Sequence, residues 1–196
     1  GIRALIVTGV QTCALPIYVA SVVQVEEGSP DDLADKLAGM SNAKRKRAID
    51  DQYQRIRMNL SNEISKGLAE VERDGDKIIV RLAERGSFRS GYADLQPGFK
   101  PLLEKVGNSI SQSSGLITIE GHTDNVPMAF SERFRSNWDL SAARSAAVAD
   151  YLLDNSNVAQ GRVTIIGLAD TKPLQSNGTS EGRSKNRRIE VIIDGG

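Results

Sequence analysis

One acidic and one basic residue in this chain could together form a site for a charged ligand. Asp124 lies in the polar run Gly-His-Thr-Asp-Asn at 121–125, directly after an alternating apolar stretch at 116–120. Such a stretch is typical of a half-buried strand, so we expect it to bring Asp124 to the rim of a sheet. Arg144 lies inside the apolar stripe of a helix predicted over 136–155. An arginine in that position must reach solvent, pair with a carboxylate or bind an anionic ligand.

Helix geometry predicts that Arg144 faces Asp124. Side chains on a helix lean toward its N-terminus, so an arginine in the second turn points back to the helix start, where the loop carrying Asp124 arrives. Two interpretations are open: an internal Asp124–Arg144 ion pair that only fixes the loop, or a pair that binds a ligand. A charged pair in a cleft is a candidate site, and spacing alone does not decide between them.

The elements expected around this pair alternate between strands and helices. Apolar periodicity predicts strands at 77–82, 116–120, 162–168 and 189–193, and helices at 95–111 and 136–155. We therefore predict an α/β (α+β) two-layer sandwich in which helices pack on one face of a single sheet. Right-handed crossovers would place the loops 121–136 and 168–180 at one edge of that sheet.

The N-terminal third of the chain is expected to stand apart from this domain. Residues 1–18 resemble the translation of sequencing-adapter DNA, so we expect them to be non-native; a short strand at 4–10 is the alternative. Residues 19–72 are predicted to form a helical linker before a compact domain at 73–196. Within the linker, a long helix over 48–71 carries an apolar stripe, which needs either the domain or a second subunit as its partner.

Composition narrows the class of protein. Hydrophobic residues make up 39% of the chain and charged residues 26%, with a formal net charge of zero, so nothing points to a nucleic-acid partner. One cysteine, Cys13, and one histidine, His122, cannot build a disulfide framework or a Cys/His metal cluster, and we expect no metal and no cofactor. The basic cluster at 44–47 is interpreted as a solvated helix face in preference to an anionic-lipid contact.

Three ordered motifs resemble those of the OmpA-like peptidoglycan-binding domain. They are Gly-His-Thr-Asp-Asn at 121–125, Asn137-x-x-Leu140-Ser141-x-x-Arg144, and Gly182-Arg183-x-x-Asn186-Arg187-Arg188-Ile189-Glu190. Three motifs in this order are a specific signal, whereas each alone would be weak. The resemblance implies a mixed sheet with helices on one face. Within the family, the segments 75–103 and 126–141 are most similar to the periplasmic region of flagellar stator B subunits, the MotB and PomB proteins.

The resemblance implies a non-catalytic anchor that holds the diaminopimelate group of the peptidoglycan stem peptide. This group is a zwitterion, so Asp124 would take its ammonium and Arg144 its carboxylate, without a cofactor. Asn137, Arg187 and Thr123 would contribute to the same ligand-binding pocket. For Asn137, a helix cap or a loop hydrogen bond is an equally good interpretation.

Neighbouring residues receive other expected roles. His122, at the end of a strand, is expected to be a structural hydrogen-bond donor, and Arg188 is expected to pair on the surface. Trp138 is expected to pack in the core, with stacking on a ligand as the alternative.

The likeness to stator B subunits also implies partners and a location. These would be a second copy of the chain, and an ion-channel A subunit reached through an inner-membrane helix that this sequence does not contain, with the domain itself in the periplasm. A general OmpA-type or lipoprotein-type wall tether is the alternative. A wall hydrolase using Asp124 and His122 is a remote third, because the sequence offers no nucleophile elbow, metal set or second acid to match.

Overall fold

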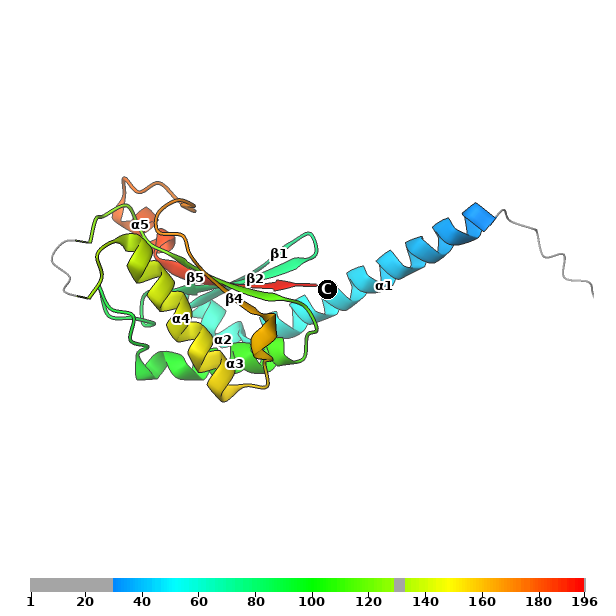
Figure 1. Cartoon of the computed structure of the whole chain (residues 1–196), viewed down its shortest axis with the longest axis horizontal. Coiled ribbons are helices and arrows are strands. Elements are labelled where there is room, and N and C mark those ends of the chain that lie inside the picture. Colours follow the sequence, from blue (N-terminus) through cyan, green and yellow to red (C-terminus); the bar gives the residue numbers. More distant parts are fainter. Residues whose placement is uncertain (1–29, 129–132, 196) are drawn as a thin grey trace, which may run out of the picture. The chain divides into compact units, whose positions relative to one another are not determined.

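A five-stranded mixed sheet forms the centre of the fold in the computed structural model, which describes residues 30–128 and 133–195 (Figure 1). The strands follow the order β1-β2-β5-β3-β4 across the sheet. Only the β3–β4 pair is parallel, and the other three pairs are antiparallel. The strands comprise β1 (Ala69–Asp74), β2 (Lys77–Ala83), β3 (Ile117–His122), β4 (Val163–Gly167) and β5 (Arg188–Asp194).

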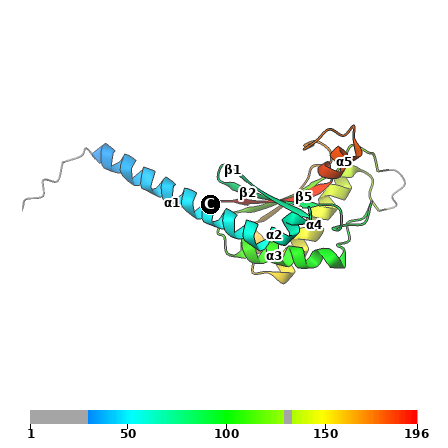
Figure 2. The same ribbon diagram turned by 180° about the vertical axis from the view of Figure 1, so that it is seen from behind.

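Helices cover one face of this sheet, which confirms the predicted two-layer sandwich (Figures 1 and 2). Helices α3 and α4 pack together, and α4 lies across β3 and β4. Short 3-10 turns, Pro97–Phe99 and Gln160–Arg162, precede α3 and β4. The α-helices comprise α1 (Pro30–Asn59), α2 (Ser61–Ser65), α3 (Lys100–Ser111), α4 (Asn137–Asn155) and α5 (Ser180–Asn186). Among the described residues no helix is long and apolar enough to cross a membrane.

The core lies between the sheet and these helices. Because successive side chains of a strand point to opposite faces, every second residue of β2, β3 and β5 enters it. Each such aliphatic side chain contributes about 1.5–3 kcal/mol by leaving water. The buried strand residues are Ile78, Val80, Leu82, Ile117, Ile119, Ile189, Val191 and Ile193, and they meet Phe99, Leu102, Leu103, Val106 and Ile110 from the helix predicted at 95–111.

The helix predicted over 48–71 ends earlier than expected. Gly67 adopts a left-handed φ of 67°, and the Gly67 and Leu68 amides donate to the carbonyls of Ile64 and Glu63, which is a Schellman ending. The chain then forms β1 from Ala69, so the boundary expected between residues 72 and 73 falls within a strand of the sheet.

The apolar stripe of the linker helix packs on the domain itself. Ile49, Ile56 and Leu60 are all buried and belong to the same core cluster as the strands. From Ala38 onward the chain forms one compact unit, so much of the predicted linker is structural. Of the two partner surfaces considered for the stripe, the described residues therefore supply the first. The adapter-like segment 1–18 lies outside the described residues.

The loops that follow β3 and β4 lie side by side, as the crossover rule predicts. The Leu168 amide donates to the Gly121 carbonyl at 2.9 Å, and the Thr123 amide donates to the Ala169 carbonyl at 2.8 Å. Helix α4 starts against the same edge, where a Cβ on Gly121 would lie 2.2 Å from the Ser141 carbonyl oxygen. Glycine is therefore required at 121 for the helix and the strand to approach this closely.

We expect Ile56→Ala to lower the free energy of unfolding by about 2–4 kcal/mol, because it removes a 1% exposed side chain that joins α1 to the core. Met58→Ala, on the same helix but 67% exposed, should change it by less than about 0.5 kcal/mol. Urea unfolding followed by circular dichroism would measure both. Equal stability of the two variants would show that α1 is not part of the folded unit.

Candidate functional site

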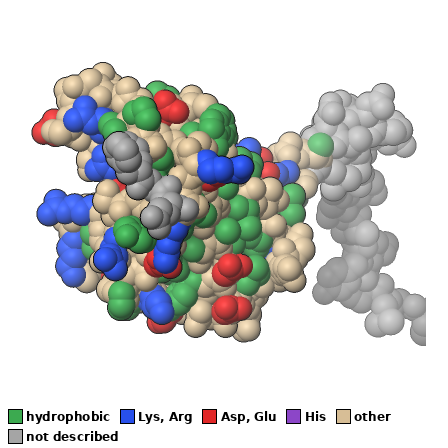
Figure 3. All heavy atoms as spheres, turned by 60° about the vertical axis from the view of Figure 1, so that its left-hand side comes forward, with side chains coloured by type: hydrophobic (Ala, Val, Ile, Leu, Met, Phe, Trp, Pro, Cys, Tyr) green, Lys and Arg blue, Asp and Glu red, His purple; other side chains and the backbone are tan. Residues whose placement is uncertain are grey.

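A cleft of about 1160 Å³ opens at the sheet edge where β3 delivers Asp124. It brings together Asp124, Thr123, Asn137, Arg144 and Arg187, the residues proposed from the sequence. Basic side chains gather on this end of the molecule (Figure 3), and Arg85, Arg133 and Arg183 also line the cleft. The candidate site is thus a polar hollow rich in guanidinium groups.

Asp124 is held by one loop hydrogen bond and one ion pair. Its Oδ1 accepts from the Val126 amide at 3.1 Å, and its Oδ2 lies 2.6 Å from Arg187 Nη1. The carboxylate is therefore already balanced by a cation, and its orientation is fixed before any ligand arrives.

Arg144 is 2% exposed, and its Nε and Nη2 atoms both have partners inside the protein. Its Nη2 lies 2.6 Å from Glu84 Oε1, and its Nε donates to the Tyr92 carbonyl at 2.9 Å. The ring of the buried Phe88 lies beneath the guanidinium, 5.0 Å away. Burial lowers the pKa of Arg144, and the adjacent Glu84 carboxylate opposes that shift.

Glu84 joins the two halves of the site. One carboxylate oxygen pairs with Arg144 and the other accepts from Arg187 Nε, while Arg187 reaches Asp124. We call Asp124, Arg187, Glu84 and Arg144, in this order, the ion-pair series. Burial lowers the pKa of Arg187, but its hydrogen bonds to Asp124 and Glu84 outweigh this and raise it.

The direct Asp124–Arg144 ion pair considered from the sequence is not among the ion pairs of the described residues. Glu84, directly after β2, takes its place as the partner of Arg144. The backbone explains why: the Glu84 amide donates to the Arg187 carbonyl at 3.1 Å and so extends the β2–β5 pairing to the cleft. Sequence reasoning missed Glu84, and its one local signal was an acid at the end of a predicted strand.

The side chains of Asn137 and Thr123 hold the loop that follows β3 by hydrogen bonds to its backbone carbonyls. The Asn137 amide donates to the carbonyls of Val126 at 2.9 Å and Asp124 at 3.2 Å, while Ser136 caps α4 by accepting from the Asp139 amide. Of the interpretations left open for Asn137, the loop hydrogen bond is therefore the one observed. The Thr123 hydroxyl donates to the Asp124 carbonyl at 2.9 Å.

Two neighbouring residues differ from expectation. Trp138 is 52% exposed, so the core-packing interpretation is wrong. Arg188 is buried, not on the surface, because it lies two residues from Glu190 on the same strand face and pairs with it at 2.6 Å.

A second group of buried charges lies on the sheet face opposite the helices. Glu120 and Glu190 are directly paired across β3 and β5, and with His122 they bring three potential metal ligands within 4.8 Å of one another. Cations already neutralise both carboxylates: Arg188 contacts Glu190, and Lys172 Nζ lies 3.6 Å from Glu120. A divalent metal would add positive charge beside these groups, so the cluster is better explained as an ion-pair network.

His122 is the buried neutral member of this network. Its Nε2 lies 3.5 Å from Glu120 Oε2, and within the described residues neither ring nitrogen makes a hydrogen bond, unlike the structural donor expected. Burial first, and then the charge of Arg188, lower the pKa of His122 to about 4.

The fold and the site together match a known family. The profile of the OmpA family matches residues 87–187, slightly more than half of the chain, and the chain belongs to this family. All five residues proposed for the site fall in the matched segment, and Arg187 is its last residue. Glu84 lies just outside it.

Named relatives include proteins of several kinds. Motility protein B of Bacillus subtilis is 35% identical over 125 residues, which is 63% of this chain and 48% of that protein. Peptidoglycan-binding protein ArfA of Mycobacterium tuberculosis is 37% identical over 109 residues, 55% of this chain and 32% of that protein. Among solved structures, the cell wall anchor of the T6SS from Pseudomonas aeruginosa is 34% identical with a TM-score of 0.67, covering 71% of this chain and 96% of that one. The match thus spans less than half of the two curated relatives.

We expect Glu84→Gln to lower the free energy of unfolding by about 3 kcal/mol, because it leaves the buried Arg144 without its counter-charge. Glu70→Gln removes the same charge from an exposed pair with Lys185 and should cost less than about 1 kcal/mol. Thermal and urea unfolding of both variants would compare them. A loss no larger for Glu84→Gln than for Glu70→Gln would contradict a stabilising role for the ion-pair series.

The free energy of unfolding should fall as the pH drops from 6.5 toward 4. In this range the unfolded chain protonates His122 while the folded chain, with its pKa of about 4, does not, so acid favours unfolding by up to about 3 kcal/mol. The pKa of Glu190, lowered by Arg188 against the effect of burial, adds a loss in the same direction at lower pH. His122→Gln should flatten the upper part of the profile. An NMR titration of the single histidine showing a pKa near 6.5 would overturn this account.

Proposed function

We propose that this chain is a non-catalytic anchor that binds peptidoglycan through the cleft beside Asp124. The observation that carries the proposal is the ion-pair series, two carboxylates and two guanidinium groups alternating along the wall of an open cleft. The series is neutral overall but strongly polar, so it favours a ligand that carries both charges close together. Membership of the OmpA family and the names of the wall-binding relatives support the same ligand.

The ligand group is the diaminopimelate side chain of the stem peptide, whose free ammonium and carboxylate form a zwitterion. Asp124 receives the ammonium at the mouth of the cleft. The Arg187 side chain, 35% exposed, offers its remaining N–H groups to the carboxylate, while Arg144 contributes charge from beneath. This differs from the two-residue clamp expected from the sequence, because Arg144 already binds Glu84 and the loop carbonyls. Asn137 and Thr123 hold the loop in place.

The wider role is that of the periplasmic region of a flagellar stator B subunit. The relation to motility protein B supports this role, and it brings the remaining partners: a second copy of the chain and a stator A subunit at the inner membrane. A general wall tether is the competing role, favoured by comparable identity to ArfA and to the T6SS anchor. Restoration of swimming by this domain, joined to the membrane helix of a stator B subunit in cells lacking that subunit, would favour the first role.

The contacts of Asp124 and His122 argue against a hydrolase. Asp124 Oδ2 lies 2.6 Å from Arg187 Nη1 and its Oδ1 accepts from the Val126 amide, so both oxygens already have partners inside the protein and neither is set to activate a water molecule. His122, the other residue considered for a hydrolase, is neutral, and its Nε2 lies 3.5 Å from Glu120 on the sheet face opposite the helices. The two residues therefore do not form an acid–base pair.

We expect the full chain to sediment with purified diaminopimelate-type peptidoglycan and Asp124→Asn to lose roughly tenfold to a hundredfold in affinity. The variant removes one charge-assisted bond to the ammonium, worth about 1.5–3 kcal/mol, while Asn can still accept from the Val126 amide. Truncation at residue 61 should be avoided, because it would remove Ile49, Ile56 and Leu60 from the core.

Asp154→Asn is the matched control, since it removes the same charge from an exposed position of α4. Equal retention of Asp124→Asn and Asp154→Asn, both folded by circular dichroism, would place the binding site elsewhere. Release of soluble wall fragments during a long incubation would instead show catalysis.

A further inference from the structure

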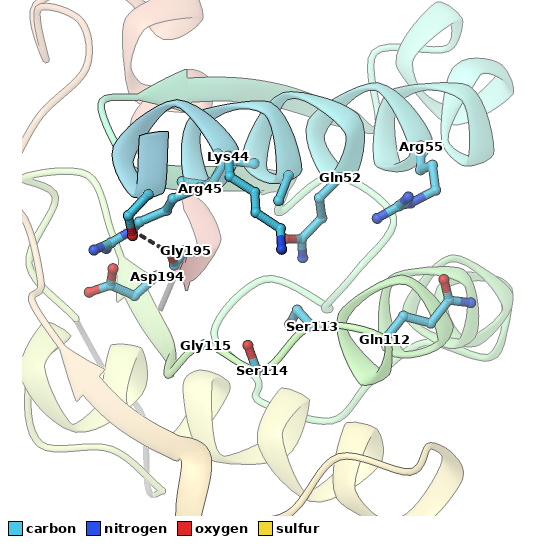
Figure 4. Close-up of a pocket in the computed structure, with 13 residues that line it drawn as sticks. Lys44, Arg45, Gln52, Arg55, Gln112, Ser113, Ser114, Gly115, Asp194 and Gly195 are labelled. Atoms are coloured by element: carbon cyan, nitrogen blue, oxygen red, sulfur yellow. Dashed lines mark hydrogen bonds between the residues drawn. The ribbon is translucent and has the colours of Figure 1, made fainter. Parts of the chain in front are cut away.

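A second cleft, of about 590 Å³, lies at the other end of β3 (Figure 4). Its walls are α1, the loop 112–115 that follows α3, and the end of β5. The two clefts share no lining residue. Asp124, in the first cleft, follows the C-terminal end of β3, whereas Gly115, in the second cleft, precedes the N-terminal end of the same strand. Any ligand bound here would therefore be separate from the one at the candidate site.

One stripe of α1 supplies the polar wall of this cleft. Lys44, Gln52 and Arg55 are separated by eight and three residues, so they project from the same side of the helix, and Arg45 lies at the edge of this side, seven residues before Gln52. Ile49, on the adjacent stripe, and Ile56 are buried in the core and fix the helix at this position. The donors are thus presented by a packed helix and not by a flexible loop.

Several of these donors have no partner inside the protein. Among the described residues, Lys44 and Arg55 make no ion pair or hydrogen bond, and Gln52 Nε2 is buried without an acceptor. Lys44 and Gln52 point across the cleft toward Ser113 and Ser114 on the opposite wall (Figure 4). A buried amide N–H without an acceptor costs free energy, and a bound ligand oxygen would remove that cost.

Within the part of the chain that the structure describes, neither the acidic side chains nor the backbone carbonyls near the cleft act as partners for Lys44 and Arg55. Among the described residues that line the cleft, Asp194 is the only acidic one, and it lies beside Arg45 (Figure 4). Arg45 itself pairs with Asp76 at 3.3 Å and donates to the Gly195 carbonyl. On the opposite wall, the Ile110 carbonyl already accepts from the Ser113 amide, and the Gly115 carbonyl already accepts from Arg162 at 2.6 Å. Lys44 and Arg55 therefore remain as an excess of positive charge.

We propose that this cleft binds a phosphate group carried by a larger molecule. An ammonium, a guanidinium, a side-chain amide and the Ser114 hydroxyl offer donors from two walls, and a tetrahedral phosphate has oxygens pointing to both. A planar carboxylate has two oxygens in one plane and would accept hydrogen bonds from the donors of one wall only. The volume exceeds that of the ion, so an attached glycerol or sugar unit also fits. This refines the interpretation of the basic cluster at 44–47: Lys44 lines the cleft, whereas Lys46 and Arg47 do not.

The first test is an NMR titration of the full chain with inorganic phosphate. We expect saturable shifts at the Gln52 side-chain amide and at the Ser114 backbone amide. The double variant Lys44→Gln with Arg55→Gln should bind about tenfold more weakly or worse, because two charge-assisted contacts are lost. The double variant Lys46→Gln with Arg47→Gln is the matched control, since it removes the same charge from exposed positions of the same helix.

Two further probes separate the sources of phosphate. The first is soluble glycerol phosphate, and the second is vesicles of phosphatidylcholine with and without phosphatidylglycerol. Sedimentation with the anionic vesicles that is lost only in the cleft variant identifies a lipid headgroup, and binding of glycerol phosphate alone identifies a soluble phosphate or polymer. Absence of saturable shifts with inorganic phosphate, or equal weakening in both double variants, would overturn the proposal.

Discussion

The contact between Arg144 and Glu84 is the interaction on which the arrangement of the cleft depends. A guanidinium buried in the second turn of α4 cannot lose its charge, so a carboxylate must be brought to it. Glu84 supplies that carboxylate from the end of β2, and through Arg187 it also orders the start of β5 and the loop after β3. One buried cation thereby ties together the ends of three segments that are far apart in the sequence.

The same contact explains why the cleft stays open and polar. The carbonyls of Arg89 and Tyr92 accept from Arg144, so the loop after β2 is held by its backbone and its side chains remain at the cleft wall. Phe88 also lines the cleft, and its ring packs beneath the Arg144 guanidinium. Rigid walls of this kind reduce the cost of ordering the site when a ligand binds.

Much of this fold could be predicted from local patterns, and what was missed depended on non-local pairing. Alternation predicted β2 and β5, and the helical stripe predicted α4 with Arg144 on its inner face. Strand β1 was missed because it is an edge strand in which charged residues alternate with half-buried ones. Its sequence also follows soon after a helix, so its short pattern resembles a continuation of that helix. Glu84 was missed because nothing local reveals that β2 pairs with β5 in the register that places it beside Arg187. Arg188, by contrast, stands two residues from Glu190, and that spacing could have indicated a buried pair.

The attachment of α1 to the core has a mechanical consequence. Ile49 joins α1 to the sheet near the end of β5, while the cleft at Asp124 lies at the opposite end of β3. Tension applied between α1 and a wall-bound cleft would run along the strands and perpendicular to the hydrogen bonds that join β3 to β5. Those bonds would then carry the load together in shear, instead of opening one after another as in a zipper. Shear loading of this kind is expected to need a higher force for unfolding than pulling across the strands.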